Sequence, residues 1–235
     1  MLDCTGHLYG HQGEFVNRTS RGERVVPALE AGAFGDVVRE RRDAAGSRRK
    51  ILGAARGLFK SRGVDSVSMY EVGRAAGVGQ GTLYRRFEHK GALCSALLAE
   101  QVEDFYEETW ERVEAEERPA RVRLAWFLDR LAGFNERNAE LLGAIRDGAG
   151  GERRAETYRN PFYGWLRATV IALLRRAEES GEIRRDLDLE CAADTLLAAL
   201  NIDLYLYQRR ELGMDRRRIV AAVHAVLDGM RDTRR

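Results

Sequence analysis

Cysteine, proline and lysine are scarce in this chain of 235 residues, which contains only three of each. The cysteines lie far apart and form no CxxC pair, which argues against a disulfide framework and a structural zinc site. No apolar run approaches the roughly 20 residues that a membrane span requires. The first ten residues also lack the charged start and apolar centre of a signal peptide. We therefore expect a cytoplasmic protein without a membrane segment.

The cysteine and histidine residues give little evidence for catalysis or metal binding. Cys94 and Cys191 fall in apolar helical stretches, so we expect them to be buried small residues rather than nucleophiles. Cys4, His7 and His11 have a loosely metal-like spacing, but their segment has no core-forming pattern. The sequence offers no close His–Cys or His–Asp arrangement and no cofactor loop. It therefore predicts no enzyme, no bound cofactor and no metal site.

Charge is distributed unevenly along the chain. The net charge is +2, but residues 47–95 hold ten basic and three acidic side chains, a local charge of +7. The basic ones are Arg48, Arg49, Lys50, Arg56, Lys60, Arg62, Arg74, Arg85, Arg86 and Lys90. A small basic module on a mildly acidic body is typical of a nucleic-acid-binding protein.

Hydrophobic spacing predicts an all-α protein of about nine or ten helices, with a hydrophobic fraction of 44% that is ample for a packed core. We expect helices at residues 51–59, 69–76, 80–87, from 89 past 110, 120–135, 138–146, 161–179, 187–210 and 215–230. No stretch alternates apolar and polar residues convincingly, so no strand is expected. Residues 1–46 are interpreted as a flexible extension, either a native arm or the product of a misplaced start codon, with a short helix near 31–42.

Two short helices joined by a glycine-containing turn lie inside the basic segment. Ser68 stands at the N-cap position of the first, and Glu71 three residues later completes a capping box. Gly77 can adopt the positive φ that the turn requires without steric cost. The outer face of the second helix is polar at Gln80, Thr82, Arg85 and Arg86. This pattern is typical of a helix-turn-helix whose second helix enters the major groove.

The segment SRRKILGAARGLFKSRGVDSVSMYEVGRAAGVGQGTLYRRFEHKGALCSALL, residues 47–98, resembles the DNA-binding domain of the tetracycline-repressor (TetR) family of transcription regulators. The resemblance rests on LF in the first helix, the RGVDSVS linker, RAAGVGQGTLYRRF across the turn, and HKGAL before the long helix. One departure is Gly73, where the family commonly has alanine, and we expect it to loosen its helix by about 1 kcal/mol.

The resemblance implies a homodimer with an N-terminal helix-turn-helix domain and a larger helical domain for ligand binding and dimerisation. We therefore divide the chain into an extension at 1–46, a DNA-binding domain at 47–95, and an effector-binding and dimerisation domain at 96–235. Helices 161–179 and 187–210 are the predicted dimerisation pair. Two-fold symmetry then predicts double-stranded DNA with a pseudo-palindromic operator as the partner.

The resemblance also assigns roles to residues of the DNA-binding domain. Gln80, Thr82 and Arg85 are candidates for base-edge or groove contacts. Tyr84 and Lys90 are candidates for backbone phosphates, with the Tyr84 ring in the core and its hydroxyl outward. The predicted DNA-binding residues are Ser68, Gln80, Gly81, Thr82, Tyr84, Arg85, Arg86 and Lys90. The glycine-rich run at 77–81 also resembles a phosphate-cradling loop, but no strand precedes it and no Lys-Ser/Thr follows, so no nucleotide site is expected there.

Most of the bulky aromatic residues lie in the C-terminal part of the chain. Core packing accounts for most of them, and the alternative is an effector cavity between helices. The tentative ligand-binding residues are Phe105, Trp126, Phe127, Tyr158, Phe162, Trp165, Asn201, Asp203 and Tyr205. Asn201 and Asp203 interrupt an apolar run, so a buried polar group there needs a partner, either on a ligand or across an interface.

The sequence thus predicts a homodimeric repressor that a small-molecule effector releases from its operator. The long helix that starts near residue 89 is the expected lever between the two domains. An activator, or a regulator without an effector, is the alternative of the same fold. An enzyme is the alternative from another class, and nothing in the sequence supports it.

Overall fold

The computed structural model describes residues 42–114, 117–148 and 160–231, with side chains from Gly46 onward, and three strands near the N-terminus. These strands are β1 (Leu8–Tyr9), β2 (Glu14–Thr19) and β3 (Gly22–Pro27), which pair antiparallel in the order β1-β2-β3. The expectation of no strand is therefore wrong in this part of the chain. Val16 lies opposite Val25 and Phe15 opposite Val26, and such β-branched and aromatic residues favour extended backbone. The helix expected near 31–42 lies outside the described residues except for Arg42.

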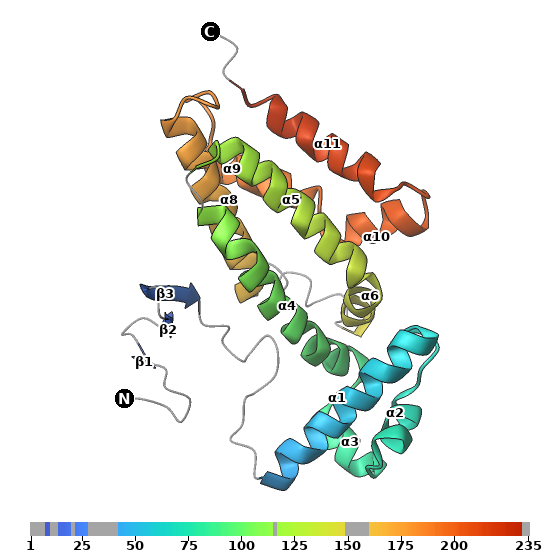
Figure 1. Cartoon of the computed structure of the whole chain (residues 1–235). Helices are drawn as coiled ribbons and strands as arrows, with labels where there is room; N and C mark the ends of the chain where they lie inside the picture. The colour runs from blue at the N-terminus through green and yellow to red at the C-terminus, as the bar shows by residue number, and fades with distance from the viewer. Residues whose placement is uncertain are drawn as a thin grey trace.

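From Arg42 onward every regular element that the structure describes is a helix, which confirms the all-α fold class for this part of the chain. The helices are α1 (Arg42–Arg62), α2 (Met69–Ala76), α3 (Gln80–Arg86), α4 (Lys90–Glu114), α5 (Ala120–Arg137), α6 (Ala139–Gly148), α8 (Pro161–Glu179), α9 (Leu189–Ala198), α10 (Ile202–Arg210) and α11 (Arg216–Asp228) (Figure 1). Within the described ranges, none of them combines the length and apolar character that crossing a membrane would take.

The predicted helix at 187–210 is in fact two helices, α9 and α10. The Asn201 side chain accepts a hydrogen bond from the Asp203 backbone N–H at 3.0 Å and so caps α10. Asp203 lies exposed in the first turn, where the positive end of the helix dipole favours a carboxylate. The expectation that both residues are buried is therefore wrong, because Asp203 is exposed and Asn201 is half-buried, while a role toward a ligand or an interface stays a prediction. Asparagine is a strong N-cap residue, and this local signal interrupts the apolar periodicity.

Two hydrophobic cores share one helix. The smaller core joins α1, α2, α3 and the start of α4, where Leu93 and Leu97 are buried. The larger core joins the rest of α4 to α5, α8, α9 and α11, with Val102 and Phe105 buried on α4. Figure 1 shows α4 running from the three-helix end of the molecule into the larger helical body. Helix α4 therefore contributes buried residues to both cores.

Candidate nucleic-acid interface

The start of α2 is fixed by a reciprocal capping box, as the sequence predicts. The Ser68 hydroxyl accepts from the Glu71 N–H at 3.2 Å, and the Glu71 carboxylate accepts from the Ser68 N–H at 2.8 Å. Glu71 also accepts from Arg62 at 2.7 Å. The Ser68 backbone N–H, and then Arg62, lower the pKa of Glu71 to about 2. Both partners stabilise the ionised carboxylate, so the cap holds at neutral pH.

The turn between α2 and α3 is also built as expected. Gly77 has φ +65°, and its N–H donates to the Arg74 carbonyl at 3.2 Å. Leu83 is fully buried beneath α3, and Phe87 is buried at its end with the Arg48 guanidinium 5.6 Å from its ring centroid. These apolar anchors fix α3 against the smaller core and leave its opposite face outward.

The outward face of α3 carries two of the three predicted base-reading residues, Thr82 and Arg85. Arg85 donates to the Thr82 hydroxyl at 3.1 Å, and Gly81 beside them is exposed. Gln80 is half-buried and turns back toward α2, where its amide donates to the Tyr70 carbonyl at 3.3 Å. Three polar side chains thus share one short helix, and their contacts with bases stay predictions.

Tyr84 is 51% exposed, so the prediction that its ring lies in the core is wrong. Helical spacing would place Tyr84 beside Phe87, but α3 ends at Arg86 and Phe87 has extended backbone with φ −137°. The whole Tyr84 side chain is therefore free to approach a DNA backbone. Tyr70 on α2 is 62% exposed and was not predicted as a contact residue. The sequence does contain a signal for the exposure of Tyr70: it lies between Met69 and Val72 of the apolar face of α2 but does not belong to that face itself.

The start of α4 carries the predicted phosphate ligand Lys90. Its ammonium donates to the Asp65 carbonyl at 3.3 Å, so it also stabilises the loop between α1 and α2. The His89 ring nitrogen Nδ1 accepts from the Ala92 N–H at 3.2 Å, which occupies one of the free N–H groups of this helix end. Ser68 is exposed and Arg86 half-buried. Figure 1 shows α2 and α3 together at the end of the molecule far from the C-terminus.

Residues 51–97 match the model of the family described as bacterial regulatory proteins, tetR family. The helix-turn-helix segment of this chain therefore matches the DNA-binding domain of the TetR family. A helix-turn-helix transcriptional regulator from Staphylococcus aureus is 26% identical over 178 residues, which cover 72% of this chain and 85% of that protein. The matched segment contains every predicted DNA-binding residue, and the chain is a DNA-binding transcription regulator.

Solved structures share the fold of this chain. FadR from Thermus thermophilus, a transcriptional repressor in complex with lauroyl-CoA, is 22% identical with a TM-score of 0.61, over 80% of this chain and 96% of that chain. FadR from Bacillus halodurans is 20% identical with a TM-score of 0.56, over 78% and 95%. A complex of SmeT with triclosan is 22% identical with a TM-score of 0.55, over 80% and 93%. These likenesses extend over the larger helical body.

Four of the tentative ligand-binding residues meet in that body. Phe105 lies 6.1 Å from Phe127, 6.0 Å from Phe162 and 6.0 Å from Trp165, measured between ring centroids. Phe105, Phe127 and Trp165 are buried, so core packing accounts for part of their role. Tyr158 lies outside the described residues.

The other tentative ligand-binding residues lie elsewhere. Trp126 lies under the Arg112 guanidinium, which is 5.1 Å from its ring centroid. Tyr205 is fully buried and donates its hydroxyl to Glu136 at 2.5 Å, so it serves the packing of α5 against α10. Asn201 and Asp203 form the α10 cap described above.

Tyr106 is a candidate that the sequence analysis missed. It is 9% exposed, it stacks edge-on at 4.3 Å from Trp165, and its hydroxyl has no hydrogen-bond partner among the described residues. Burial raises the pKa of this hydroxyl, so it stays protonated. A buried hydroxyl without a partner is costly, and a bound ligand or water would satisfy it.

The two cysteines with described surroundings differ from each other. Cys94 is buried as expected, and burial raises the pKa of its thiol to about 11. Cys191 is exposed on α9, so the expectation of a buried residue is wrong there. Cys4, His7 and His11 lie outside the described residues.

Proposed function

We propose that this regulator is a homodimeric cytoplasmic repressor that a small-molecule effector releases from a pseudo-palindromic operator. The observation that carries the proposal is the exposed polar face of α3, fixed to the core by Leu83 at one end of the molecule. The aromatic cluster around Phe105 lies on the same helix, α4, that supports this end. A ligand in the cluster can thus act on the DNA-binding end through α4.

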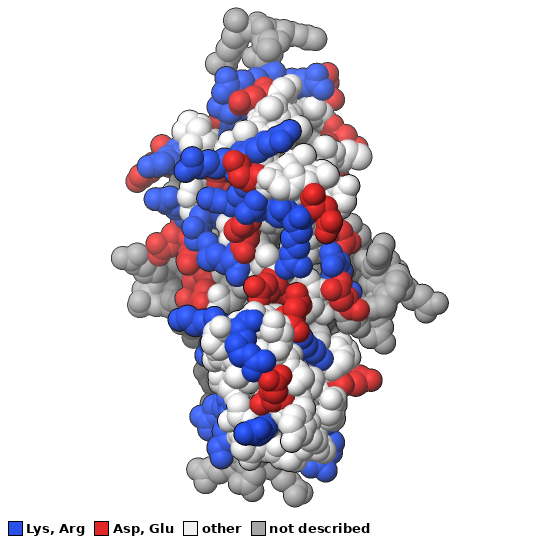
Figure 2. Space-filling view, turned by 90° about the vertical axis from the view of Figure 1, so that its right-hand side faces the viewer, with Lys and Arg blue, Asp and Glu red and all other residues white. Residues whose placement is uncertain are grey.

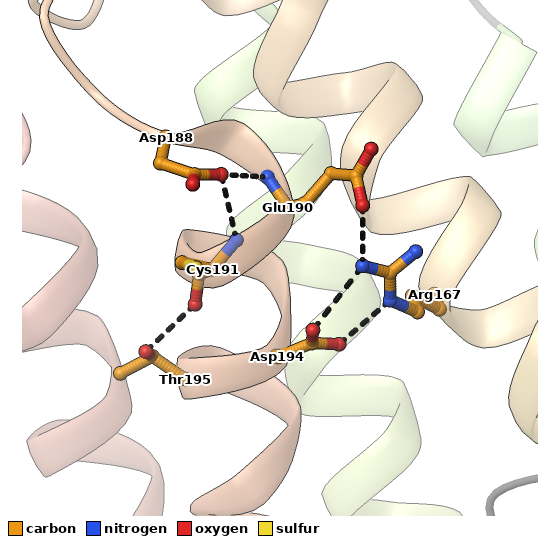
Figure 3. Close-up of polar contacts among 6 residues, drawn as sticks. All are labelled: Arg167, Asp188, Glu190, Cys191, Asp194 and Thr195. Atoms are coloured by element: carbon orange, nitrogen blue, oxygen red, sulfur yellow. Dashed lines mark hydrogen bonds and ion pairs between the residues drawn. The ribbon is translucent and has the colours of Figure 1, made fainter.

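The exposed faces of α8 and α9 support dimerisation through this pair of helices. Small residues are exposed at successive turns of both helices: Gly164, Ala168 and Ala172 on α8, and Cys191, Thr195 and Ala198 on α9. Arg167 on α8 ties the two helices together, because it donates to Asp194 at 2.8 Å and to Glu190 at 2.9 Å (Figure 3). A flat face of small side chains lets the helices of a second copy approach closely.

The aromatic cluster supports a largely apolar effector with one hydrogen-bonding group. Tyr106 and Trp165 would surround its apolar part, and the unpartnered Tyr106 hydroxyl would take its polar group. The related structures with lauroyl-CoA and triclosan agree with an effector of this kind.

Helix α6 supplies a second connection between the body and the DNA-binding end. The Glu140 carboxylate accepts from the Val64 N–H, in the loop between α1 and α2, at 2.8 Å. Leu141 and Ala144 of α6 pack against the smaller core. An effector that shifts α4 against α6 would change the spacing of the two α3 helices in the dimer and so weaken operator binding.

Selection of bound fragments from a random DNA pool, at physiological salt, tests this proposal. We expect an enriched inverted repeat, because two α3 helices related by two-fold symmetry read two half-sites. Binding without enrichment that disappears as salt rises would contradict it, since phosphate contacts alone behave in this way. A transcription assay with and without an apolar effector then separates a repressor from an activator or an effector-independent regulator.

A further inference from the structure

A groove of about 730 Å³ lies between α5 and α11, away from the aromatic cluster and from α3. Residues at successive turns of each helix line it: Trp126, Gly133 and Arg137 from α5, and Arg216, Val220 and His224 from α11. Trp126 and Gly133 are two turns apart on one face of α5, roughly 10 Å along the helix. A groove of this volume is of the size that small-molecule ligands occupy.

Two arginines from helices far apart in the sequence converge on the bare backbone of Gly133. A Cβ atom on Gly133 would lie 3.4 Å from Nη1 of Arg137 and 3.6 Å from Nη1 of Arg216. Among the described residues, neither arginine forms an ion pair, and the same holds for Arg217 beside them. The nearby Glu136 carboxylate attracts Arg216 but forms no ion pair with it. Like charges repel, so two guanidinium groups that meet without an ion-paired carboxylate favour an anion between them.

Two carboxylates, Glu136 and Asp129, also line the groove. Glu136 accepts from Arg209 at 2.8 and 2.6 Å and from the Tyr205 hydroxyl at 2.5 Å. Asp129 Oδ1 lies 3.1 Å from the His224 ring but has no hydrogen-bond partner among the described residues. Arg137, Arg216 and Arg217 therefore supply an excess of positive charge. Figure 2 shows basic side chains gathered in a band on the side of the molecule that carries α11.

We propose that the groove between α5 and α11 binds a small molecule that carries two or more phosphate groups. Guanidinium groups present paired N–H donors that match phosphate oxygens, and both helices direct such groups to one point over Gly133. Trp126 and Val220 provide apolar surface for the remainder of the ligand. This site is separate from the effector site of the proposed function and does not depend on it.

Calorimetric titration of the full chain with pyrophosphate tests the site, with inorganic phosphate and ADP as further probes. We expect saturable pyrophosphate binding that Arg137→Gln and Arg216→Gln each weaken by about tenfold, the loss of roughly one charge-assisted hydrogen bond. Arg218→Gln is the matched control, because Arg218 is exposed on the same turn of α11 but does not line the groove. It should change the dissociation constant by less than about twofold.

Three results would overturn the proposal. One is the absence of binding at millimolar pyrophosphate. Another is an equal loss in Arg218→Gln, which would mean diffuse attraction by the charge of α11. The third is that the protein does not bind pyrophosphate, while Arg137→Gln and Arg216→Gln weaken its binding to non-specific duplex DNA or to an acidic protein. The groove would then be a contact surface for a macromolecule. Operator binding, measured on the same variants, reports on the proposed function separately.

Discussion

The side-chain amide of Gln80 occupies the space beside Gly73 that a side chain would need. A Cβ atom on Gly73 would lie 2.7 Å from Nε2 of Gln80 and 3.3 Å from a methyl group of Leu83. Glycine at this position therefore does more than loosen α2, because it admits the Gln80 side chain over the helix. The candidate base-reading residue Gln80 is therefore positioned by its contact with α2 as well as by α3.

Gly73→Ala should displace the Gln80 amide from α2 and change the base preference at the position that Gln80 reads. The unfolding free energy should change by less than about 1 kcal/mol, since the gain in helix propensity offsets the crowding of Leu83. Selection from a random DNA pool and thermal melts measure the two effects. Gly53→Ala in α1, where no atom lies within 4 Å of the new Cβ, is the control and should leave base preference unchanged.

Lys90→Ala and Tyr84→Phe should weaken binding to operator and to random DNA alike, because both residues are predicted phosphate contacts. For Lys90→Ala, the slope of the logarithm of the binding constant against the logarithm of the salt concentration should decrease in magnitude by about one, because one charged phosphate contact is lost. Gln80→Ala should instead alter sequence preference. Titrations at several salt concentrations measure these effects, and equal losses on both kinds of DNA in all three variants would contradict the assignment. Melts of Lys90→Ala control for its hydrogen bond to Asp65.

Stability should depend on acid pH through Glu136. Hydrogen bonds from Arg209, and then from Tyr205, lower the pKa of Glu136 from 4.5 to about 2. Because the folded pKa is depressed, the contribution to stability is present above pH 4.5 and is lost as the pH falls toward about 2. Melting temperatures of wild type and Glu136→Gln across this range should converge at the acid end. Arg209→Gln should reduce the pH dependence in the same way, and an unchanged profile would contradict this account.

Glu140→Ala should loosen the connection between α6 and the loop between α1 and α2. Removal of the acceptor for the Val64 N–H should lower the unfolding free energy by about 1 kcal/mol. Hydrogen exchange in a peptide around Val64 should become faster, while exchange in α8 should not change. Glu140→Gln keeps an oxygen acceptor and should lie between wild type and Glu140→Ala. If exchange at Val64 stayed slow in Glu140→Ala, the hydrogen bond would not stabilise this loop.

Ala168→Glu should dissociate the dimer, because it places a charge on the small-residue face of α8. Light scattering during size-exclusion chromatography should give the monomer mass, and binding to an inverted repeat should weaken with it. Ala222→Glu on the exposed face of α11 is the control and should leave both unchanged. A dimer that persists in Ala168→Glu would place the interface elsewhere.

Features set by neighbouring residues could be predicted from the sequence. The capping box at Ser68, the turn at Gly77 and the limits of α8 all depend on contacts between residues a few positions apart. The sequence pattern at each place therefore contains all the residues that determine it. The cap at Asn201 was present in the sequence too, but the apolar run around it concealed the helix end.

Features that join distant segments required the tertiary structure. The arginines that converge on Gly133 come from α5 and α11, and no spacing in the sequence relates them. The unpartnered hydroxyl of Tyr106 is evident only once α5 and α8 have buried its ring. Periodicity indicates which face of a helix is buried, but the packing of the other helices decides which polar atoms find partners. The sequence by itself thus determined the DNA-binding module, and the packing of the helical body decided which buried polar groups are left without a partner.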